Sequence, residues 1–263
     1  MNCEQQNSSE PLLKQESRTL FTATPKDFVA TLPLHHFEGR IVVVQSKVEA
    51  EKAVKALKTQ RILGIDTETK PSFRKGHTNQ VALLQVCMRD VCFLFRLNEI
   101  GFLPCLQSLL GDKKICKVGL SLKDDALMLQ RKEPSFKPAG FLDLQNFAAE
   151  LGVKDKSLLK LYANVFHKRI SKKMRLSNWE ADVLSEPQKV YAATDASVCL
   201  DLFAELKRLK ASGQYALIPE PVKEDAPLPD CDANDNQQFQ FSIFLPVDIF
   251  KHSLFCPLFF NFL

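Results

Sequence analysis

The 263-residue sequence lacks any C-x-x-C pair, which argues against the usual ligand spacing of a structural zinc site. Its eight cysteines are spread along the chain. Several stand inside apolar runs, such as Cys87 after Val86 and Cys92 between Val91 and Phe93. We therefore expect the cysteines to be small buried side chains in a reducing compartment, and we expect no disulfide framework.

A membrane-spanning segment is also missing. Residues 237–263 hold eight of the twenty phenylalanines, but Asp248, Lys251 and His252 interrupt them before the ~20 apolar residues that span a bilayer are reached. This Phe-rich tail is either an interfacial or partner-docking peptide or a non-homologous end, and its role is unknown. Residues 1–16 are polar and lack the apolar core of a secretory signal. We expect a cytoplasmic protein, or a nuclear or organellar one in a eukaryote, without a membrane span.

The remaining composition is ordinary for a globular protein, with 45% hydrophobic and 25% charged residues. The net charge of +4 is weak support for an anionic partner and leaves the oligomeric state unknown. Residues 1–38, with scattered prolines, predict a flexible N-terminal arm, and residues 40–209 predict the folded domain. Residues 210–236 are acidic and Pro-rich, which is typical of a linker, and they precede the tail at 237–263.

The hydrophobic pattern predicts an α/β fold with one mixed sheet and helices on its faces. Apolar runs at 81–86 and 91–95 flank Arg89 and Asp90, which indicates a hairpin, and strand–helix alternation follows. The other predicted strands are 41–44, 62–65, 115–118 and 141–144. The predicted helices are 48–57, 103–110, 122–131, one that ends near 151–152, and most of 157–209.

Two acids leave the core at the end of the strand predicted at 62–65. Side chains alternate along a strand, so Asp66 and Glu68 point to the same face, roughly 7 Å apart along the chain. Paired carboxylates at this position are suited to holding a hard cation. The alternative is a polar strand end that runs into a turn, and for an isolated D-x-E pair that is the commoner case.

A second acid stands on the apolar face of a helix. Ser185, followed by Pro187 and Gln188, has the pattern of a helix start with a capping box. In the helix that follows, one stripe contains Tyr191, Asp195 and three apolar residues at 198, 202 and 206. A carboxylate on a buried stripe is costly unless it is paired or coordinated. Asp195 is therefore either part of a site or satisfied by an arginine or a helix N-terminus.

Two further acids, Asp124 and Asp125, fall in the first turn of the helix predicted at 122–131. Gly119 provides the turn that leads into this helix. The helix dipole favours acids at such a position, so alone they indicate no function.

In order along the chain, Asp66-x-Glu68, Gly119-x5-Asp125 and Tyr191-x3-Asp195 resemble the three motifs of the DEDDy 3′-5′ exonucleases. This family belongs to the DnaQ-like, ribonuclease-H-like superfamily. The strings SNW at 177–179 and YAATDA at 191–196 are most similar to the Werner syndrome helicase exonuclease domain and its stand-alone bacterial relatives, and less similar to ribonuclease D. The resemblance covers about residues 40–208 and implies a ribonuclease-H-like mixed sheet in a single domain.

The resemblance implies that five residues are catalytic: Asp66, Glu68, Asp125, Tyr191 and Asp195. Its four acids would bind two divalent cations, Mg²⁺ or Mn²⁺, and its tyrosine would orient the attacking water. The chemistry is consistent, because two cations neutralise charge on the attacking and leaving oxygens and carboxylates are the ligands that hold hard cations. A tyrosine with an ordinary pKa of about 10 is a poor base at neutral pH, which favours a positioning role.

Residues 154–175 carry eight lysines and arginines and one acid. Such a run is usually a solvated surface, but beside a phosphodiesterase site it favours contact with phosphates. Trp179 is expected in the core rather than stacked on a base. The predicted substrate-binding residues are Arg74, Lys75, Lys168, Arg169, Lys172 and Lys173.

The sequence therefore predicts an exonuclease that removes 5′-mononucleotides from a single-stranded 3′ end or from recessed DNA, with RNA as an alternative substrate. Polarity and product come from the resemblance alone. Two other hypotheses are an RNA 3′-end trimming enzyme of the ribonuclease D type and a catalytically silent nucleic-acid-binding module. An interaction protein that docks through the Phe-rich tail is a further alternative.

Overall fold

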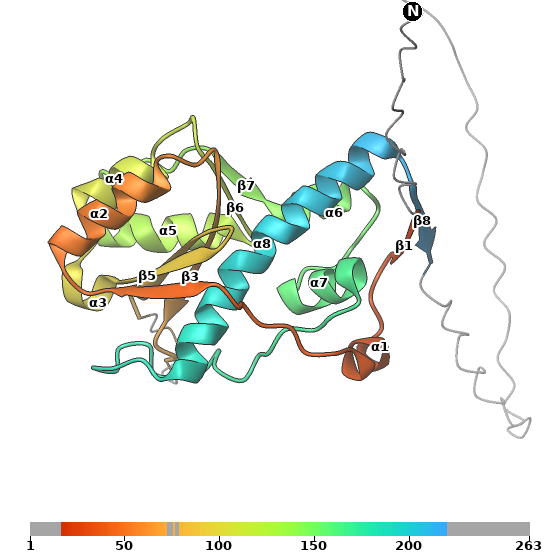
Figure 1. The fold of residues 1–263 in the computed structure, drawn as a ribbon, viewed down its shortest axis with the longest axis horizontal. Helices are drawn as coiled ribbons and strands as arrows, with labels where there is room; N and C mark the ends of the chain where they lie inside the picture. Colours follow the sequence, from red (N-terminus) through yellow and green to blue (C-terminus); the bar gives the residue numbers. More distant parts are fainter. Residues whose placement is uncertain (1–16, 73–75, 77–78, 220–263) are drawn as a thin grey trace, which may run out of the picture. The chain divides into compact units, whose positions relative to one another are not determined.

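The computed structural model of the chain describes residues 17–72, 76 and 79–219 and shows an α/β fold (Figure 1). The strands are β1 (Arg18–Phe21), β2 (Arg40–Val44), β3 (Ile62–Thr69), β4 (Val81–Met88), β5 (Val91–Arg96), β6 (Cys116–Gly119), β7 (Phe141–Asp143) and β8 (Tyr215–Ile218). The helices are α1 (Lys26–Thr31), α2 (Lys47–Leu57), α3 (Leu97–Ile100), α4 (Pro104–Leu110), α5 (Leu122–Lys132), α6 (Leu144–Ala149), α7 (Leu158–Phe166) and α8 (Glu186–Ser212). The Phe-rich tail and three of the cysteines (Cys3, Cys231 and Cys256) lie outside the described residues.

The main sheet has six strands in the order β2-β5-β4-β3-β6-β7. The β4–β5 hairpin and the β3–β4 pair are antiparallel, and the other three pairs are parallel. The two-residue turn at Arg89 and Asp90 sets the hairpin register by pairing Met88 with Val91. This arrangement confirms the predicted mixed sheet and places β3 in its interior.

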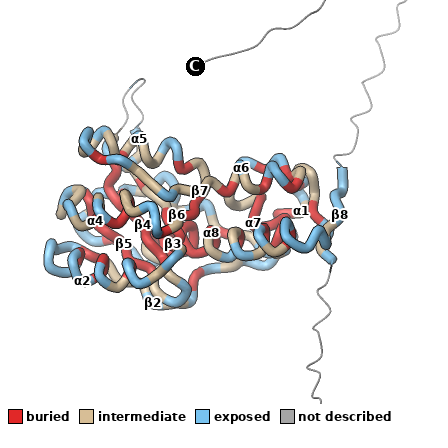
Figure 2. The backbone as a smooth tube through the Cα atoms, turned by 90° about the horizontal axis from the view of Figure 1, so that it is seen from above, coloured by how far each residue is buried: buried red, intermediate tan, exposed pale blue. Residues whose placement is uncertain are grey.

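Helices cover both faces of this sheet, and the strands form its buried centre (Figure 2). On one face, α2, α4 and α5 pack over a core that includes Leu57, Ile65 and Leu109. On the other face, α8 runs across β3, β4 and β5, and alanines of α8 pack against Leu83 and Leu94. The two covered faces together explain why β4 is almost continuously apolar, since neither face meets water.

Helix α8 comes unusually close to β3 because Gly64 has no side chain. A Cβ atom at Gly64 would lie 2.1 Å from the carbonyl oxygen of Ala196. Asp195 precedes Ala196 on the helix, and Asp66 stands two residues after Gly64 on the strand. The missing side chain therefore allows the approach that brings these two acids together.

The start and buried stripe of α8 are as predicted. Ser185 and Gln188 form the reciprocal hydrogen bonds of a capping box, and Gly213 ends the helix with a φ of 65°. Tyr191 and Asp195 are both buried, as are the three apolar residues of the stripe. No helix in the described part of the chain is long and apolar enough to cross a membrane.

Residues 17–38 differ from the flexible arm that the sequence predicts for 1–38. β1 pairs in parallel with β8, which lies within the predicted linker at 210–236. Leu20 is fully buried in the core formed by α6, α7 and α8. The side chain of Asn164 accepts a hydrogen bond from the backbone nitrogen of Phe21 and donates one to its oxygen, both at 2.8 Å. Each partner is more than 140 residues away in sequence, so local pattern did not indicate the pairing.

The prediction of a mostly helical stretch over 157–209 is wrong for residues 167–185. α7 ends at His167, which has a left-handed φ of 52°, and the basic residues that follow are irregular until α8 begins. Trp179 within this segment is fully buried, and its ring centroid lies 5.9 Å from that of Tyr191. The prediction that Trp179 belongs to the core is confirmed.

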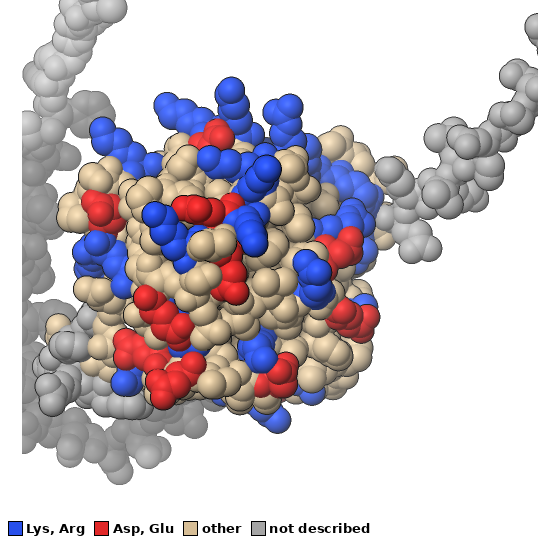
Figure 3. All heavy atoms as spheres, turned by 60° about the vertical axis from the view of Figure 1, so that its left-hand side comes forward, with Lys and Arg blue, Asp and Glu red and all other residues tan. Residues whose placement is uncertain are grey.

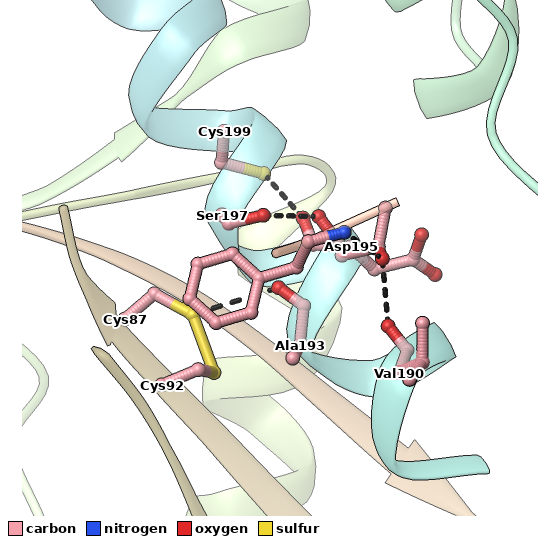
Figure 4. Close-up of a disulfide and its surroundings, with 9 residues drawn as sticks. Cys87, Cys92, Val190, Ala193, Asp195, Ser197 and Cys199 are labelled. Carbon is pink, nitrogen blue, oxygen red and sulfur yellow. Dashed lines mark hydrogen bonds between the residues drawn. A yellow bond between two sulfur atoms is a disulfide. The ribbon is translucent and has the colours of Figure 1, made fainter. Parts of the chain in front are cut away.

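Of the cysteines in the described residues, Cys87, Cys92 and Cys199 are buried as predicted, whereas Cys105 and Cys116 are half-buried. The sequence predicted no disulfide framework, but the structure contains a disulfide. Cys87 and Cys92 are disulfide-bonded, with their Cα atoms 4.1 Å apart (Figure 4). The turn at 89–90 sets this pair, because it places Cys87 directly opposite Cys92 in the hairpin. The Cys87 sulfur also lies 3.5 Å from the carbonyl oxygen of Ala193 on α8. The hairpin pattern in the sequence contained this signal, since a two-residue turn fixes the pairing of its flanks.

Candidate active site

Three carboxylates converge where β3 meets α8. Asp66, Glu68 and Asp195 each offer an oxygen, and these oxygens all lie within 4.8 Å of one another. Glu68 and Asp195 are buried, with 9% and 7% of their surface exposed. One carboxylate oxygen of Asp195 is buried without a hydrogen-bond partner, and an unpaired oxygen of this kind is a feature expected of a cation ligand. The alternation along β3 and the stripe on α8 thus lead to one cluster.

The cluster is electrostatically unfavourable for ionised acids. Burial, followed by repulsion from Asp195 and Asp125, raises the pKa of Glu68 to about 9. Burial also raises the pKa of Asp195 to about 7, and burial and three neighbouring acids raise the pKa of Asp66 well above its ordinary value. Without a counter-charge, the folded state therefore favours protonated acids here.

Asp125 lies beside this cluster but is not one of the three converging acids. It stands in the first turn of α5, and its carboxylate accepts a hydrogen bond from the Thr67 hydroxyl. Burial raises the pKa of Asp125 to about 6. The charge of Asp125 in turn adds to the raised pKa values of Asp66 and Glu68. Its neighbour Asp124 is exposed to solvent. Of these two adjacent acids, the structure thus brings Asp125, the one that the motif resemblance selects, beside the cluster.

Tyr191 precedes Asp195 by one helical turn and is 8% exposed. Burial, and then the charges of Asp195 and Glu68, raise the pKa of Tyr191 above its ordinary value. A hydrogen bond between Tyr191 and Asp195 lowers the pKa of the acid, although burial outweighs this effect. The hydroxyl is therefore protonated at neutral pH and can donate a hydrogen bond.

The donor set fits a hard divalent cation. All three groups are carboxylates, which Mg²⁺ and Mn²⁺ prefer, and their oxygens lie within 4.8 Å of one another. Binding a cation would also offset the burial and the repulsion between acids that raise these pKa values. These residues could hold a metal ion.

A model of the 3′-5′ exonuclease family matches residues 41–210. The chain belongs to this family. The prediction of a DnaQ-like 3′-5′ exonuclease, and with it that of a nuclease hydrolase, is confirmed. The matched range contains the three converging acids, together with Asp125 and Tyr191.

Two curated relatives of the exonuclease chain are about a third identical to it. A 3′-5′ exonuclease of Arabidopsis thaliana is 32% identical over 193 residues, which is 67% of this chain and 67% of the relative. The mouse bifunctional 3′-5′ exonuclease/ATP-dependent helicase WRN is 30% identical over 207 residues. That match covers 75% of this chain but only 15% of the mouse protein.

Solved structures share the fold of the exonuclease. The Nibbler EXO domain of Aedes aegypti has a TM-score of 0.62 at 22% identity, covering 67% of this chain and 93% of that one. Escherichia coli RNase D has a TM-score of 0.59 at 21% identity, covering 67% of this chain and 46% of that one. At these identities the likeness supports the fold alone.

The predicted substrate-binding residues of the exonuclease are dispersed. Lys172 is exposed, and its charge lowers the pKa of Asp195 against the effect of burial. Arg169 instead donates a hydrogen bond from Nε to the Leu32 carbonyl at 2.9 Å, which gives it a structural contact. The charge of Lys168 acts to lower the pKa values of His35 and Asp201, neither of which belongs to the cluster. Lys173 is exposed, and Arg74 and Lys75 lie outside the described residues.

Sequence analysis missed three residues close to the cluster. Thr67 donates to Asp125, and the Arg175 charge lowers the pKa of Glu68. Gln85 stands directly across from Asp66 in β4, fully buried, and neither atom of its amide group has a hydrogen-bond partner within the described residues. The patterns in the sequence predicted both strands but not the register of β3 against β4, so this neighbour could not be found. On the face in Figure 3, lysine and arginine side chains gather along the upper edge, and acids lie among them.

Proposed function

We propose that the protein is a metal-dependent 3′-5′ exonuclease that hydrolyses phosphodiester bonds and releases 5′-mononucleotides. The observation that supports this most directly is the convergence of three buried carboxylates within 4.8 Å, one with an unpartnered oxygen. A buried acidic cluster destabilises a protein unless a cation offsets it, and the family to which the chain belongs is that of 3′-5′ exonucleases. Asp66, Glu68, Asp125 and Asp195 are proposed to hold two divalent ions, Mg²⁺ or Mn²⁺.

Such ions would supply charge neutralisation at the attacking and leaving oxygens of the phosphodiester. The side chains of the protein position the attacking water and the phosphate. The Tyr191 hydroxyl, held protonated, donates a hydrogen bond that orients the attacking water toward the scissile phosphate. Arg175 and Lys172, whose charges already act on Glu68 and Asp195, lie where a negatively charged phosphate is favoured.

We propose DNA with a single-stranded or recessed 3′ end as the first substrate, because the curated relatives include the DNA polymerase I of Aquifex aeolicus, which is 29% identical over 157 residues. RNA trimming of the ribonuclease D type is the second candidate, supported by the shared fold with RNase D. Arg74, Lys75, Lys168, Arg169, Lys172 and Lys173 are proposed to contact phosphates, with Lys172 best placed for it. A cytoplasmic location, or a nuclear or organellar one in a eukaryote, is also a prediction.

Three 5′-labelled substrates of one sequence test this function: single-stranded DNA, recessed duplex DNA and single-stranded RNA. With Mn²⁺ or Mg²⁺ we expect stepwise shortening from the 3′ end and free 5′-mononucleotides, and with EDTA no cleavage. Cleavage of RNA alone would favour the ribonuclease D type. Binding without cleavage in either metal would contradict the enzyme and indicate a silent binding module.

A further inference from the structure

The segment before the matched family range packs beside the domain next to α7. α1 lies outside residues 41–210, and both views place it next to α7 (Figure 1, Figure 2). Lys160 of α7 donates a hydrogen bond from Nζ to the Thr24 carbonyl at 2.8 Å. On the other side, Arg169 donates from Nε to the Leu32 carbonyl, and its backbone nitrogen donates to the Pro33 carbonyl at 2.9 Å. The segment is thus fixed at both of its ends.

A groove of about 630 Å³ lies between α1, the start of α7 and residues 169–173. Val29, Leu159 and Ile170 form an aliphatic floor. No acidic side chain lines the groove among the described residues. Five of its lining residues are basic, namely Lys26, Lys160, Arg169, Lys172 and Lys173.

These positive charges are not neutralised by the protein. Within residues 17–72, 76 and 79–219, none of the five forms an ion pair. Lys26 and Lys173 are exposed, and neither side chain makes a hydrogen bond to the described part of the chain. A concave surface with several uncompensated cations and no acid is suited to a polyanion.

The groove adjoins a cavity that Tyr191 of the candidate active site lines. A smaller cavity of about 220 Å³ is lined by Tyr191 and shares Ser171 and Lys173 with the groove. Lys172 lines the groove, and its positive charge lowers the pKa of Asp195 against the larger effect of burial. A nucleic-acid strand with its 3′ end at the acids could therefore extend past Lys173 toward Lys26.

We propose that α1 completes a groove that binds the sugar–phosphate backbone of the substrate strand upstream of the scissile bond. The proposal rests on the proposed exonuclease function, and it assigns to this chain's N-terminal segment a share in substrate binding. No aromatic side chain lines the groove among the described residues, so bases have no stacking platform there. Binding in the groove is therefore independent of sequence and depends on salt and strand length.

The test compares Lys26→Glu with Lys113→Glu in the full chain. Lys113 is also exposed, lies in the turn between α4 and β6, and does not line the groove, so it is a matched charge reversal. Affinity for a labelled single strand is measured in EDTA at several salt concentrations, so that cleavage cannot interfere. We expect Lys26→Glu to weaken binding of a strand of about 20 nucleotides by about fivefold or more and to reduce the salt slope by about 0.7 per lost phosphate contact. Lys113→Glu should match the wild type.

A small substrate separates this proposal from the proposed function. The p-nitrophenyl ester of thymidine 5′-monophosphate spans only the scissile bond, so its hydrolysis with Mn²⁺ should be equal in both variants and the wild type. If the wild type cleaves neither this ester nor a strand, the proposed function is wrong. The strand affinities of Lys26→Glu and Lys113→Glu still test whether the groove binds nucleic acid. Equal strand affinity and salt slope in the two variants would overturn the groove. Competition by poly-glutamate as effective as by a single strand of equal charge would overturn its assignment to nucleic acid.

Discussion

Replacing Asp66 by asparagine tests whether the acidic cluster is built around a cation. The substitution keeps the shape of the side chain but removes an acid whose pKa is raised well above its ordinary value by burial and three neighbouring acids, from a site where two other carboxylates have oxygens within 4.8 Å. Two ionised carboxylates at that separation repel each other by about 3.5 kcal/mol at an effective dielectric constant of about 20. Asp66 is also the acid that the family resemblance suggests as a ligand to both ions.

The net gain is smaller than the full repulsion because the neighbours are partly protonated. At pH 7 the raised pKa of Glu68, about 9, keeps it mostly neutral, and Asp195, at about 7, is roughly half ionised. We therefore expect Asp66→Asn to stabilise the metal-free protein by about 1–3 kcal/mol. For a domain of this size that raises Tm by about 2–4 °C per kcal/mol.

The effect has a defined pH dependence. The pKa values of Glu68 and Asp195 rise from ordinary values of 4.5 and 3.8 in the unfolded chain to about 9 and about 7 in the folded protein. The folded state thus binds more protons, so the metal-free wild type loses stability as pH rises from about 4 to about 9. The Tm advantage of Asp66→Asn should be small at pH 5.5 and larger at pH 8.5.

Thermal melts in EDTA and in Mn²⁺ measure both effects. The wild type should gain about 2.7 kcal/mol from Mn²⁺ at a hundred times its dissociation constant, whereas Asp66→Asn should gain little and be inactive. Asp124→Asn is the matched control, because this exposed acid lies outside the cluster and should leave the metal-free Tm unchanged. If Asp66→Asn melts below the wild type in EDTA, or keeps the full Mn²⁺ shift, the metal-site interpretation is refuted.

Three other predictions address single roles. Asp125→Ala should lower kcat about 10³-fold, whereas Asp124→Ala should retain most activity, and equal losses would refute the assignment. Tyr191→Phe should lower kcat with little change in KM, because its hydroxyl acts mainly in the transition state, and a rise in KM at constant kcat would show substrate binding instead. Charge reversal at Lys172 and Lys173 should weaken strand binding equally for all sequences and flatten its salt dependence, and an unchanged salt slope would place both lysines off the substrate path.

The sequence alone predicted the mixed sheet and the principal acids of the cluster. The periodicity of β3 placed Asp66 and Glu68 on one face, and the capping box and apolar stripe of α8 placed Asp195 on its buried side. These inferences succeeded because they depend on residues a few positions apart, for which helix and strand geometry fix direction. The ordered motifs then identified the family.

Tertiary structure decided what depends on pairs distant in sequence. Only the folded chain places Gln85 opposite Asp66, and only the packing of α5 against β3 gives Asp125 its hydrogen bond from Thr67. The N-terminal segment was predicted as an arm because its partners in α7 and β8 lie far along the chain. No local pattern specifies which distant surface a short segment meets. That choice is made by burial, hydrogen bonding and the close approach that Gly64 permits.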